Sequence, residues 1–106
     1  MNIRVINRRD RLFLPNTVYI GRGSVFGNRF IIGKDGTREE VIDKYQDWLE
    51  GEIKRGKKVM REMIRLLRKA QNSKILYLEC YCAPKACHGD ILKLVLKKMD
   101  LDSREE

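Results

Sequence analysis

One continuously apolar segment in the last third of the chain constrains the fold more than any other feature. Residues 74–81 contain the run Ile75-Leu76-Tyr77-Leu78, in which apolar side chains do not alternate with polar ones. Such a run is typical of a central strand in a parallel sheet that is covered on both faces. Because parallel strands are joined by long crossover connections, usually helices, the segment predicts an α/β fold.

Helical segments are indicated before and after this strand. Thr37 and Glu40 form a Thr-x-x-Glu capping box, which predicts the start of a first helix. Gly51 and Gly56 predict a break or a bend. Apolar residues at helical spacing predict two further helices, at residues 57–70 and 90–99.

Two further strands complete the predicted sheet. Imperfect alternation over residues 2–8 indicates an edge strand, and the β-branched and aromatic residues 17–20 indicate a buried one. The element order predicts an α/β fold with a small, mainly parallel sheet of three to four strands, about three helices and Rossmann-like layering. We expect a single domain over residues 1–99, followed by a polar tail, residues 100–106, that frays.

Every cysteine of the chain and its only histidine lie within residues 80–90, between the apolar strand and the last predicted helix. Cys87, where that helix begins, is a candidate nucleophile, because the positive helix end and His88 favour a thiolate. The alternative is a tetrahedral zinc site, although a second C-x-x-C element is missing. Its ligands would be Cys80, Cys82, Cys87 and His88. In a third interpretation the cysteines are small buried apolar groups and His88 is a capping or packing residue.

The number of cysteines bears on their redox state. Three clustered thiols are typical of reduced cysteines rather than of a disulfide framework. Cys80 and Cys87 can nevertheless pair on oxidation.

Five glycines occur between residues 21 and 36, mixed with large apolar side chains, so this segment is predicted to be an ordered loop. Its glycines permit a positive φ and a close approach of N–H groups to an anion, and Arg22 can grip a phosphate. The spacing matches neither the dinucleotide fingerprint nor the Walker loop, and a tight turn packed by Phe26 and Phe30 also explains the glycines. The candidate ligand-binding residues of the two segments are Gly21, Arg22, Gly23, Ser24, Gly27, Asn28, Cys80 and Cys82.

The net charge of +8 is concentrated in two blocks of the sequence. Residues 1–34 hold seven Lys or Arg against one acid, and residues 54–69 hold eight against one. A basic excess favours polyanionic partners, and Arg61, Arg65 and Arg68 on the second helix form a candidate nucleic-acid surface. A solvated helix face beside the acidic first helix explains the same arginines. The abundance of Lys, Arg and Glu is also typical of thermophilic proteins.

Both unusual segments follow predicted strands directly, which places them at the carboxyl ends of those strands. Ligands of open α/β sheets bind at this edge. If the strands at residues 17–20 and 74–81 are parallel neighbours, the glycine-rich loop and the cysteine turn line one pocket. A structure with Arg22 and His88 on opposite sides of the molecule would exclude that pocket.

Several short motifs along the chain resemble those of a known family. They are Val18-Tyr19-Ile20-Gly21-Arg22-Gly23-Ser24, Gly27-Asn28 before an aromatic residue, Thr37-Arg38-Glu39-Glu40, Tyr45 to Leu49, and Cys80-x-Cys82-Ala83-Pro84-x-x-Cys87-His88-Gly89-Asp90. Over roughly residues 17–96 the chain resembles the short viral and prokaryotic proteins called domain of unknown function 4326. That family usually has Pro after the Gly-Asn pair, where this chain has Arg29. The Pro-x-x-Cys-His element is also similar to one in another uncharacterised α/β family, which implies a strand-to-helix turn but no activity.

These observations together predict a small intracellular protein that binds a nucleotide or another phosphorylated small molecule between the two loops. Arg22 and the glycine N–H groups would hold the phosphate, and Asn28 would hydrogen-bond the ligand. Cys87 and His88 would be the catalytic residues of any transferase or hydrolase reaction. The alternatives are a non-catalytic basic nucleic-acid-binding protein and a metal-stapled interaction module.

The sequence also bears on location and partners. No run approaches the roughly 20 apolar residues that span a bilayer, so we expect no membrane partner. We expect a cytoplasmic location, which would be the host cytoplasm for a viral protein. No particular cofactor or oligomeric state is indicated.

Overall fold

A computed structural model describes residues 1–10 and 14–104 of the chain. In chain order its elements are β1 (Ile3–Asn7), the 3-10 turn η1 (Arg8–Asp10), β2 (Thr17–Tyr19), α1 (Arg38–Arg55), α2 (Lys58–Gln71), β3 (Leu76–Cys80) and α3 (His88–Arg104). None of these helices is long and apolar enough to cross a membrane.

The three strands form one parallel sheet in the order β1-β3-β2. The apolar strand β3 is therefore central, as predicted, and Leu78 pairs with Val5 on one side and with Val18 on the other. Because β2 and β3 are parallel neighbours, their carboxyl ends meet at one edge of the sheet. The prediction of a small α/β fold with a mainly parallel sheet and about three helices is confirmed.

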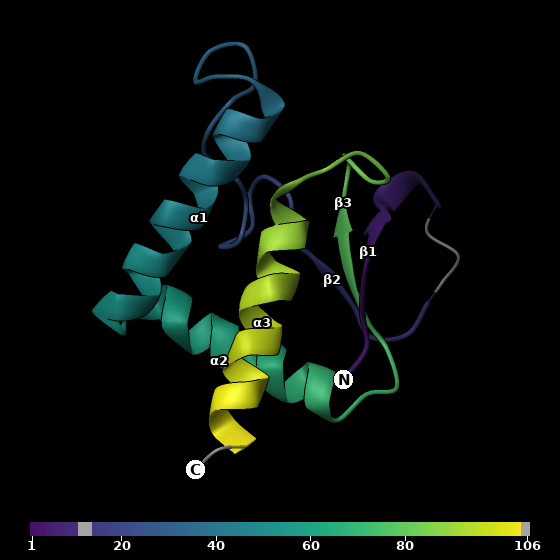
Figure 1. Cartoon of the computed structure of the whole chain (residues 1–106). Coiled ribbons are helices and arrows are strands. Elements are labelled where there is room, and N and C mark those ends of the chain that lie inside the picture. Colours follow the sequence, from purple (N-terminus) through teal and green to yellow (C-terminus); the bar gives the residue numbers. More distant parts are fainter. Residues whose placement is uncertain (11–13, 105–106) are drawn as a thin grey trace.

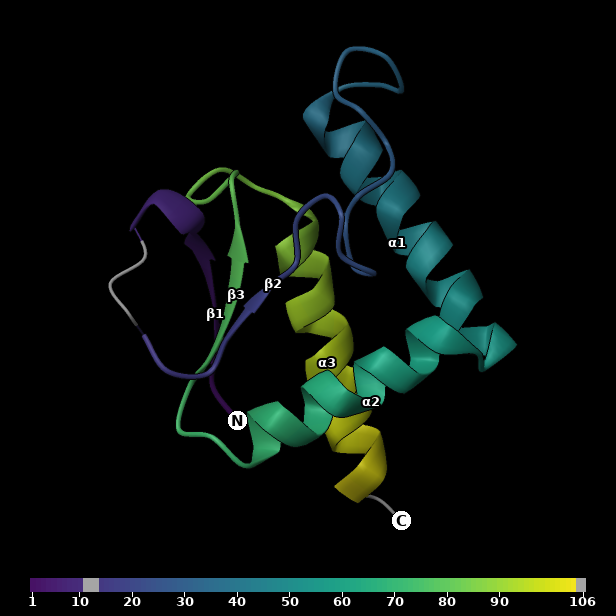
Figure 2. The same cartoon turned by 180° about the vertical axis from the view of Figure 1, so that it is seen from behind.

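The two faces of the sheet are covered differently. The helices lie on one side of the sheet (Figures 1 and 2). Side chains alternate along a strand, so Glu79 points to the opposite side from the core residues Leu78 and Cys80. Glu79 is only 2% exposed, and its Oε1 lies 3.5 Å from Nε of Arg8. The apolar run thus predicted a buried strand correctly, but not a buried carboxylate on the face away from the helices.

One apolar core joins the helices to the sheet. α1 packs on α2 and α3, and α3 packs on β1 and β3. Leu49, Met63 and Leu92 bring the three helices together and are fully buried. Truncating any one of them to Ala would destabilise the fold by about 2–5 kcal/mol, because a cavity would remain.

Helix α1 begins at the predicted cap and ends at Gly56, one of the two glycines predicted to mark a break or a bend. The Thr37 side chain accepts a hydrogen bond from the Glu40 N–H group, and the Glu40 side chain accepts one from the Thr37 N–H group. The helix then continues through Gly51, so the predicted break there is wrong. It ends at Gly56, whose left-handed φ of 66° is typical of a helix C-cap.

Helix α3 extends beyond the predicted boundary and includes most of the expected tail. Asp100 is only 6% exposed, because its carboxylate accepts a hydrogen bond from Gln71 at 2.9 Å and lies 3.2 Å from Arg104. The prediction that residues 100–106 fray is therefore wrong as far as Arg104, and residues 105–106 lie outside the described part of the chain. The polar composition of the tail gave no indication of the hydrogen bond between Gln71 and Asp100, which joins the end of α3 to α2.

Candidate functional site

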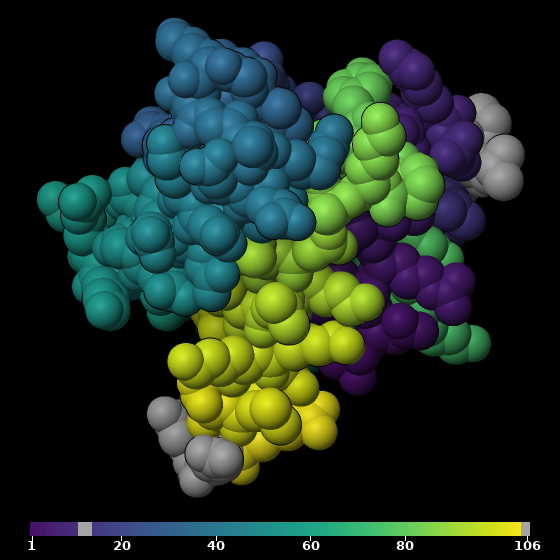
Figure 3. All heavy atoms as spheres, turned by 45° about the horizontal axis from the view of Figure 1, so that its top comes forward, coloured from purple at the N-terminus to yellow at the C-terminus, as the bar shows by residue number. Residues whose placement is uncertain are grey.

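A cavity of about 460 Å³ lies at the carboxyl edge of the sheet, between the loop after β2, the start of α1 and the turn after β3. Figure 3 shows a recess between the blue residues that precede α1 and the green residues of the turn. Arg22 and His88 both line the cavity, which confirms that the two segments share one pocket. Its lining residues are Tyr19, Gly21, Arg22, Asn28, Phe30, Ile31, Ile32, Arg38, Val41, Ile42, Cys80, Tyr81, Cys82, Ala86, Cys87 and His88.

The Cys-His-Gly-Asp motif at residues 87–90 is first of all a helix start. The Cys87 sulfur accepts a hydrogen bond from the Gly89 N–H group at 3.3 Å, and the Asp90 carboxylate accepts one from the Cys87 N–H group at 3.0 Å. This reciprocal pattern is that of a capping box, with sulfur in place of a hydroxyl. A Cβ atom at Gly89 would lie 2.9 Å from side-chain carbons of Ile20 and Val5, so glycine lets α3 pack closely on the sheet.

Cys80 and Cys87 form a buried thiol pair on the cavity wall. Their sulfurs lie 3.5 Å apart, and both cysteines are free and only 1% and 3% exposed. A hydrogen bond from Cys87, helped by the N–H groups of Ala83 and Cys82, lowers the pKa of Cys80 from 9.0 to about 6. The same hydrogen bond, together with burial, raises the pKa of Cys87. These two shifts favour a thiolate at Cys80 over one at Cys87, where the sequence predicted it.

His88 holds the start of α3 against the end of β2. Its Nε2 donates a hydrogen bond of 2.6 Å to the Ile20 carbonyl, and its ring packs edge-on against Tyr45 with 5.0 Å between the ring centroids. The residue is 6% exposed, and burial lowers the pKa of the imidazole, which is therefore neutral near pH 7. The packing role that the sequence allowed for His88 is present, and Nε2 is occupied by the backbone.

Two backbone N–H groups of the glycine-rich loop form hydrogen bonds within the loop itself. Those of Ser24 and Gly27 donate to the carbonyls of Gly21 and Ser24, so of the three glycines predicted to approach an anion, Gly27 has its N–H group already engaged. Only Gly23 among the three leading glycines has a positive φ, of 93°. Gly21 and Gly27 instead permit close packing, because a Cβ at Gly27 would lie 2.7 Å from the Gly21 oxygen.

The remaining predicted loop residues are also held by the loop. Asn28 donates to the Val41 carbonyl at 3.2 Å and accepts from the Phe30 N–H group at 2.9 Å, so its amide joins the loop to α1. Gly23, Ser24 and Gly27 line a second hollow beside the first, to which Arg22 and Asn28 also contribute. The structure thus divides the predicted ligand-binding residues between two neighbouring depressions.

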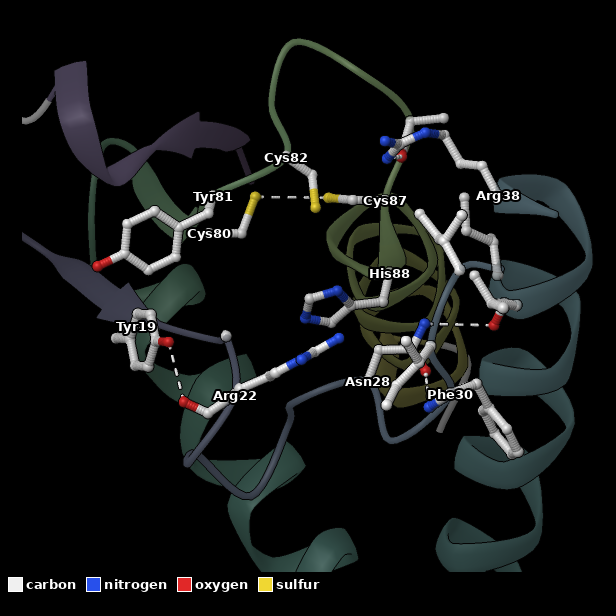
Figure 4. Close-up of a pocket in the computed structure, with 16 residues that line it drawn as sticks. Tyr19, Arg22, Asn28, Phe30, Arg38, Cys80, Tyr81, Cys82, Cys87 and His88 are labelled. Atoms are coloured by element: carbon white, nitrogen blue, oxygen red, sulfur yellow. Dashed lines mark hydrogen bonds between the residues drawn. The ribbon is translucent and has the colours of Figure 1, made fainter. Parts of the chain in front are cut away.

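Two arginines make the first cavity electropositive. In Figure 4, Arg22 extends from its loop towards His88, and Arg38 lies at the opposite rim. An Nη atom of Arg38 donates a hydrogen bond of 2.9 Å to the Ala86 carbonyl, which joins the start of α1 to the cysteine turn. Within the described part of the chain, no Asp or Glu lines this cavity. Arg38 was not among the predicted site residues, although its place directly after the helix cap was visible in the sequence.

Apolar and aromatic side chains form the rest of the wall. Tyr81 is 57% exposed, and its ring stands edge-on to that of Tyr19 with 6.3 Å between the centroids. Ile31 and Ile32 are also exposed, and Phe30 lies beside them in the lining. These residues were not predicted as site residues. The position of Tyr81 between Cys80 and Cys82 was the one signal in the sequence that pointed to it.

The structure bears differently on the two predicted alternatives, a metal site and a nucleic-acid surface. Among the residues that the structure describes, no three His, Cys, Asp or Glu side chains form a group that could hold a metal ion. The metal site at Cys80, Cys82, Cys87 and His88 is therefore not supported. The arginines of the proposed nucleic-acid surface lie on an exposed face of α2 and line neither hollow; they are Arg61, Arg65 and Arg68.

Comparison with known proteins agrees with the motifs. Residues 4–98 match a family described as Domain of unknown function (DUF4326). The chain is also 34% identical over 102 residues to an uncharacterised 12.4 kDa protein in the nrdA-td intergenic region of Enterobacteria phage T4, over 93% of this chain and 82% of that protein. No solved structure matches the chain. The family match spans nearly the whole described fold, so this chain belongs to the DUF4326 family.

Proposed function

We propose that this protein binds a nucleotide, or a closely related phosphorylated small molecule, in the cavity between the glycine-rich loop and the cysteine turn. The observation that carries the proposal is the chemistry of the lining. Two arginines stand at the rim, an apolar and aromatic wall stands between them, and no described acid lines the cavity. A ligand that combines an anionic group with a flat apolar group matches both halves.

The anionic half of the ligand would be held by guanidinium groups. Arg22 is exposed, and its side chain reaches into the cavity from one rim. Arg38 is already anchored through Ala86, so it can bind an anion with little further loss of side-chain freedom. The N–H groups of Ser24 and Gly27 are occupied, so the two guanidinium groups would be the main phosphate ligands.

The flat half of the ligand would pack on the exposed aromatic and aliphatic groups. Tyr81 presents its ring to solvent, and Tyr19 supports that ring from the side. Base–aromatic stacking contributes about 1–3 kcal/mol per base in proteins that bind nucleic acid bases. A cavity of about 460 Å³ is in the ordinary range for small-molecule sites.

Catalysis in this cavity stays a prediction. The raised pKa of Cys87 disfavours its thiolate, and Nε2 of His88 is hydrogen-bonded to the Ile20 carbonyl, so this arrangement does not favour a Cys87–His88 nucleophile and base. Any thiol chemistry would begin at the Cys80 sulfur.

Binding of mononucleotides, nucleosides and inorganic phosphate, measured by calorimetry, tests the proposal. We expect the nucleotide to bind most tightly, and Arg22→Ala to weaken its affinity by at least about tenfold, because a charge-assisted hydrogen bond is lost. Tyr81→Ala should weaken binding as well, whereas Tyr81→Phe should retain most of it, because the ring is kept.

Arg29→Ala is the matched control for charge. Arg29 lies in the same loop but lines only the second hollow, where its guanidinium stands 5.1 Å from the centre of the Trp48 ring. It removes one positive charge without altering the first cavity. Equal losses of affinity in Arg22→Ala and Arg29→Ala, or equal binding of nucleotide and nucleoside, would contradict the proposal.

The exposed face of α2 supports a second candidate function, nucleic-acid binding. Arg61 and Arg68 are solvent-exposed on this face, and Arg65 pairs with Glu62 at 2.9 Å. Binding to a DNA or RNA duplex would weaken steeply with salt, and Arg61→Ala with Arg68→Ala would reduce that salt dependence. Arg22→Ala would leave such binding nearly unchanged, which separates the two candidates.

A further inference from the structure

We propose that Cys80 and Cys87 are a redox-active pair that a small hydroperoxide oxidises to a disulfide on the wall of the cavity. The two sulfurs come from the rigid end of β3 and from the cap of α3, and they already contact each other at 3.5 Å. A disulfide requires about 2.05 Å between sulfurs, so the pair needs only a small approach to close. This inference does not depend on the proposed nucleotide.

The surroundings of the pair favour a peroxide as the oxidant. Both cysteines are almost fully buried in the protein yet line the cavity, so only a water-sized reagent reaches the sulfurs easily. The electropositive rim formed by Arg22 and Arg38 also favours the negative charge that develops when an oxygen–oxygen bond breaks. The lowered pKa of Cys80 supplies a thiolate, which is the reactive form of a cysteine.

Disulfide formation balances in atoms and electrons with the two thiols and one hydroperoxide. The Cys80 thiolate attacks one peroxide oxygen, and the oxygen–oxygen bond breaks to leave Cys80 as a sulfenic acid. The released oxygen takes a proton from solvent and leaves as water or an alcohol. The Cys87 sulfur then attacks the Cys80 sulfur, the sulfur–oxygen bond breaks, and hydroxide leaves with the Cys87 proton as water. The two thiols lose two electrons and the peroxide gains them.

Cys82 provides a reference thiol in the same molecule. It is half-buried and lines the cavity, but the structure assigns it no sulfur–sulfur hydrogen bond of the kind that joins the other two cysteines. Oxidation of the reduced full chain with one equivalent of hydrogen peroxide, followed by alkylation and peptide mapping, compares the three cysteines directly. We expect a Cys80–Cys87 disulfide as the main product, reversed by dithiothreitol, and at least about tenfold slower oxidation of Cys82.

A trapping experiment fixes the order of events. In Cys87→Ser the reaction should stop at a sulfenic acid on Cys80, which dimedone labels once the oxidised chain is unfolded in its presence, whereas Cys80→Ser should give no comparable label on Cys87. Circular dichroism checks that both variants are folded, and the wild-type peptide map stands even if one is not. A main product that contains Cys82, or alkylation of Cys80 and Cys87 while Cys82 is oxidised, would overturn the proposal.

Discussion

The loop after β2 and the turn after β3 meet at the same edge of the sheet, but their polar groups are used differently. In the loop, the N–H groups of Ser24 and Gly27 and the amide of Asn28 are bonded within the loop or to α1. In the turn, the sulfur of Cys87 both accepts a hydrogen bond in the helix cap and is hydrogen-bonded to the free thiol of Cys80 beside a cavity. The comparison teaches that a glycine-rich motif can be mainly structural while the reactive groups lie in the partner segment.

The largest expected effect concerns the thiolate of the turn. In wild type, one thiolate per chain should form around pH 6, because Cys87 donates a hydrogen bond to Cys80. Cys87→Ala removes the donor, so the pKa of Cys80 should rise towards the ordinary value of 9.0. Cys87→Ser keeps a donor and should keep the pKa low. Thiolate absorbance followed from pH 4 to pH 10 measures all three proteins.

If the thiolate of Cys87→Ala formed at the same pH as in wild type, the proposed role of the Cys87 hydrogen bond would be contradicted. It would mean that the N–H groups of Ala83 and Cys82 stabilise the Cys80 thiolate without the second thiol. The same titration in Cys80→Ser identifies the residue, because no thiolate should then appear near pH 6.

The next effect concerns close packing in the loop. Gly27→Ala should destabilise the protein by about 2–3 kcal/mol, because the new Cβ would lie 2.7 Å from the backbone oxygen of Gly21 and the loop would have to shift. Gly51→Ala is the matched control: nothing lies within 4 Å of a Cβ there, and Ala in a helix interior should stabilise by about 0.5–1 kcal/mol. Urea unfolding measures both free energies. Similar changes in the free energy of unfolding for the two variants would show that the backbone does not pack closely against Gly27.

A smaller effect concerns the amide that joins the loop to α1. Asn28→Ala should cost about 1–2 kcal/mol of stability, because the Val41 carbonyl and the Phe30 N–H group lose their partners. Arg29→Ala, one residue along, should cost less, because it removes only the contact with the Trp48 ring. Urea unfolding again provides the measurement. A cost for Arg29→Ala as large as that for Asn28→Ala would contradict this assignment.

Much of the fold could be predicted because its signals are local. The apolar run of β3 and the Thr37 capping box each depend on residues close together in the chain, and the rule for parallel strands then brought the two loops to one edge. The site was less predictable, because its decisive contacts join distant residues. Arg38 reaches Ala86, and His88 reaches Ile20, across 48 and 68 positions respectively. No periodicity in the sequence encodes such hydrogen bonds.

The sequence also could not show which of the two cysteines is more easily ionised. A helix start beside a histidine favoured Cys87, but the position of the proton depends on which sulfur receives the other's hydrogen bond. Cys80 lies seven residues earlier, at the end of a strand, and only the folded turn brings its sulfur to Cys87. The sequence therefore indicated the segment, whereas the choice between its two buried sulfurs depends on their contact in the folded turn.

The smallest expected effect is a pH dependence of stability, which tests whether His88 has a structural rather than a chemical role. Burial lowers the pKa of its imidazole below the ordinary value of 6.5, so the unfolded chain takes up a proton before the folded protein does as the pH falls. Stability should therefore fall as the pH decreases from about 6.5 towards the folded-state pKa. Cys80 titrates in the same region with its own effect, since its lowered pKa adds stability as the pH rises from about 6 towards 9.

The difference between wild type and His88→Gln separates these two contributions. Glutamine keeps a donor for the Ile20 carbonyl but does not titrate, and the Cys80 contribution is present in both proteins. Chemical unfolding at pH 7.5, 6.5 and 5.5 should show wild-type stability decreasing relative to the variant as the pH falls. A constant difference across this range would mean that the imidazole is not held neutral against Ile20 and Tyr45. His88 would then be free to act in the cavity, and the original pairing of Cys87 with His88 would regain its place as a candidate.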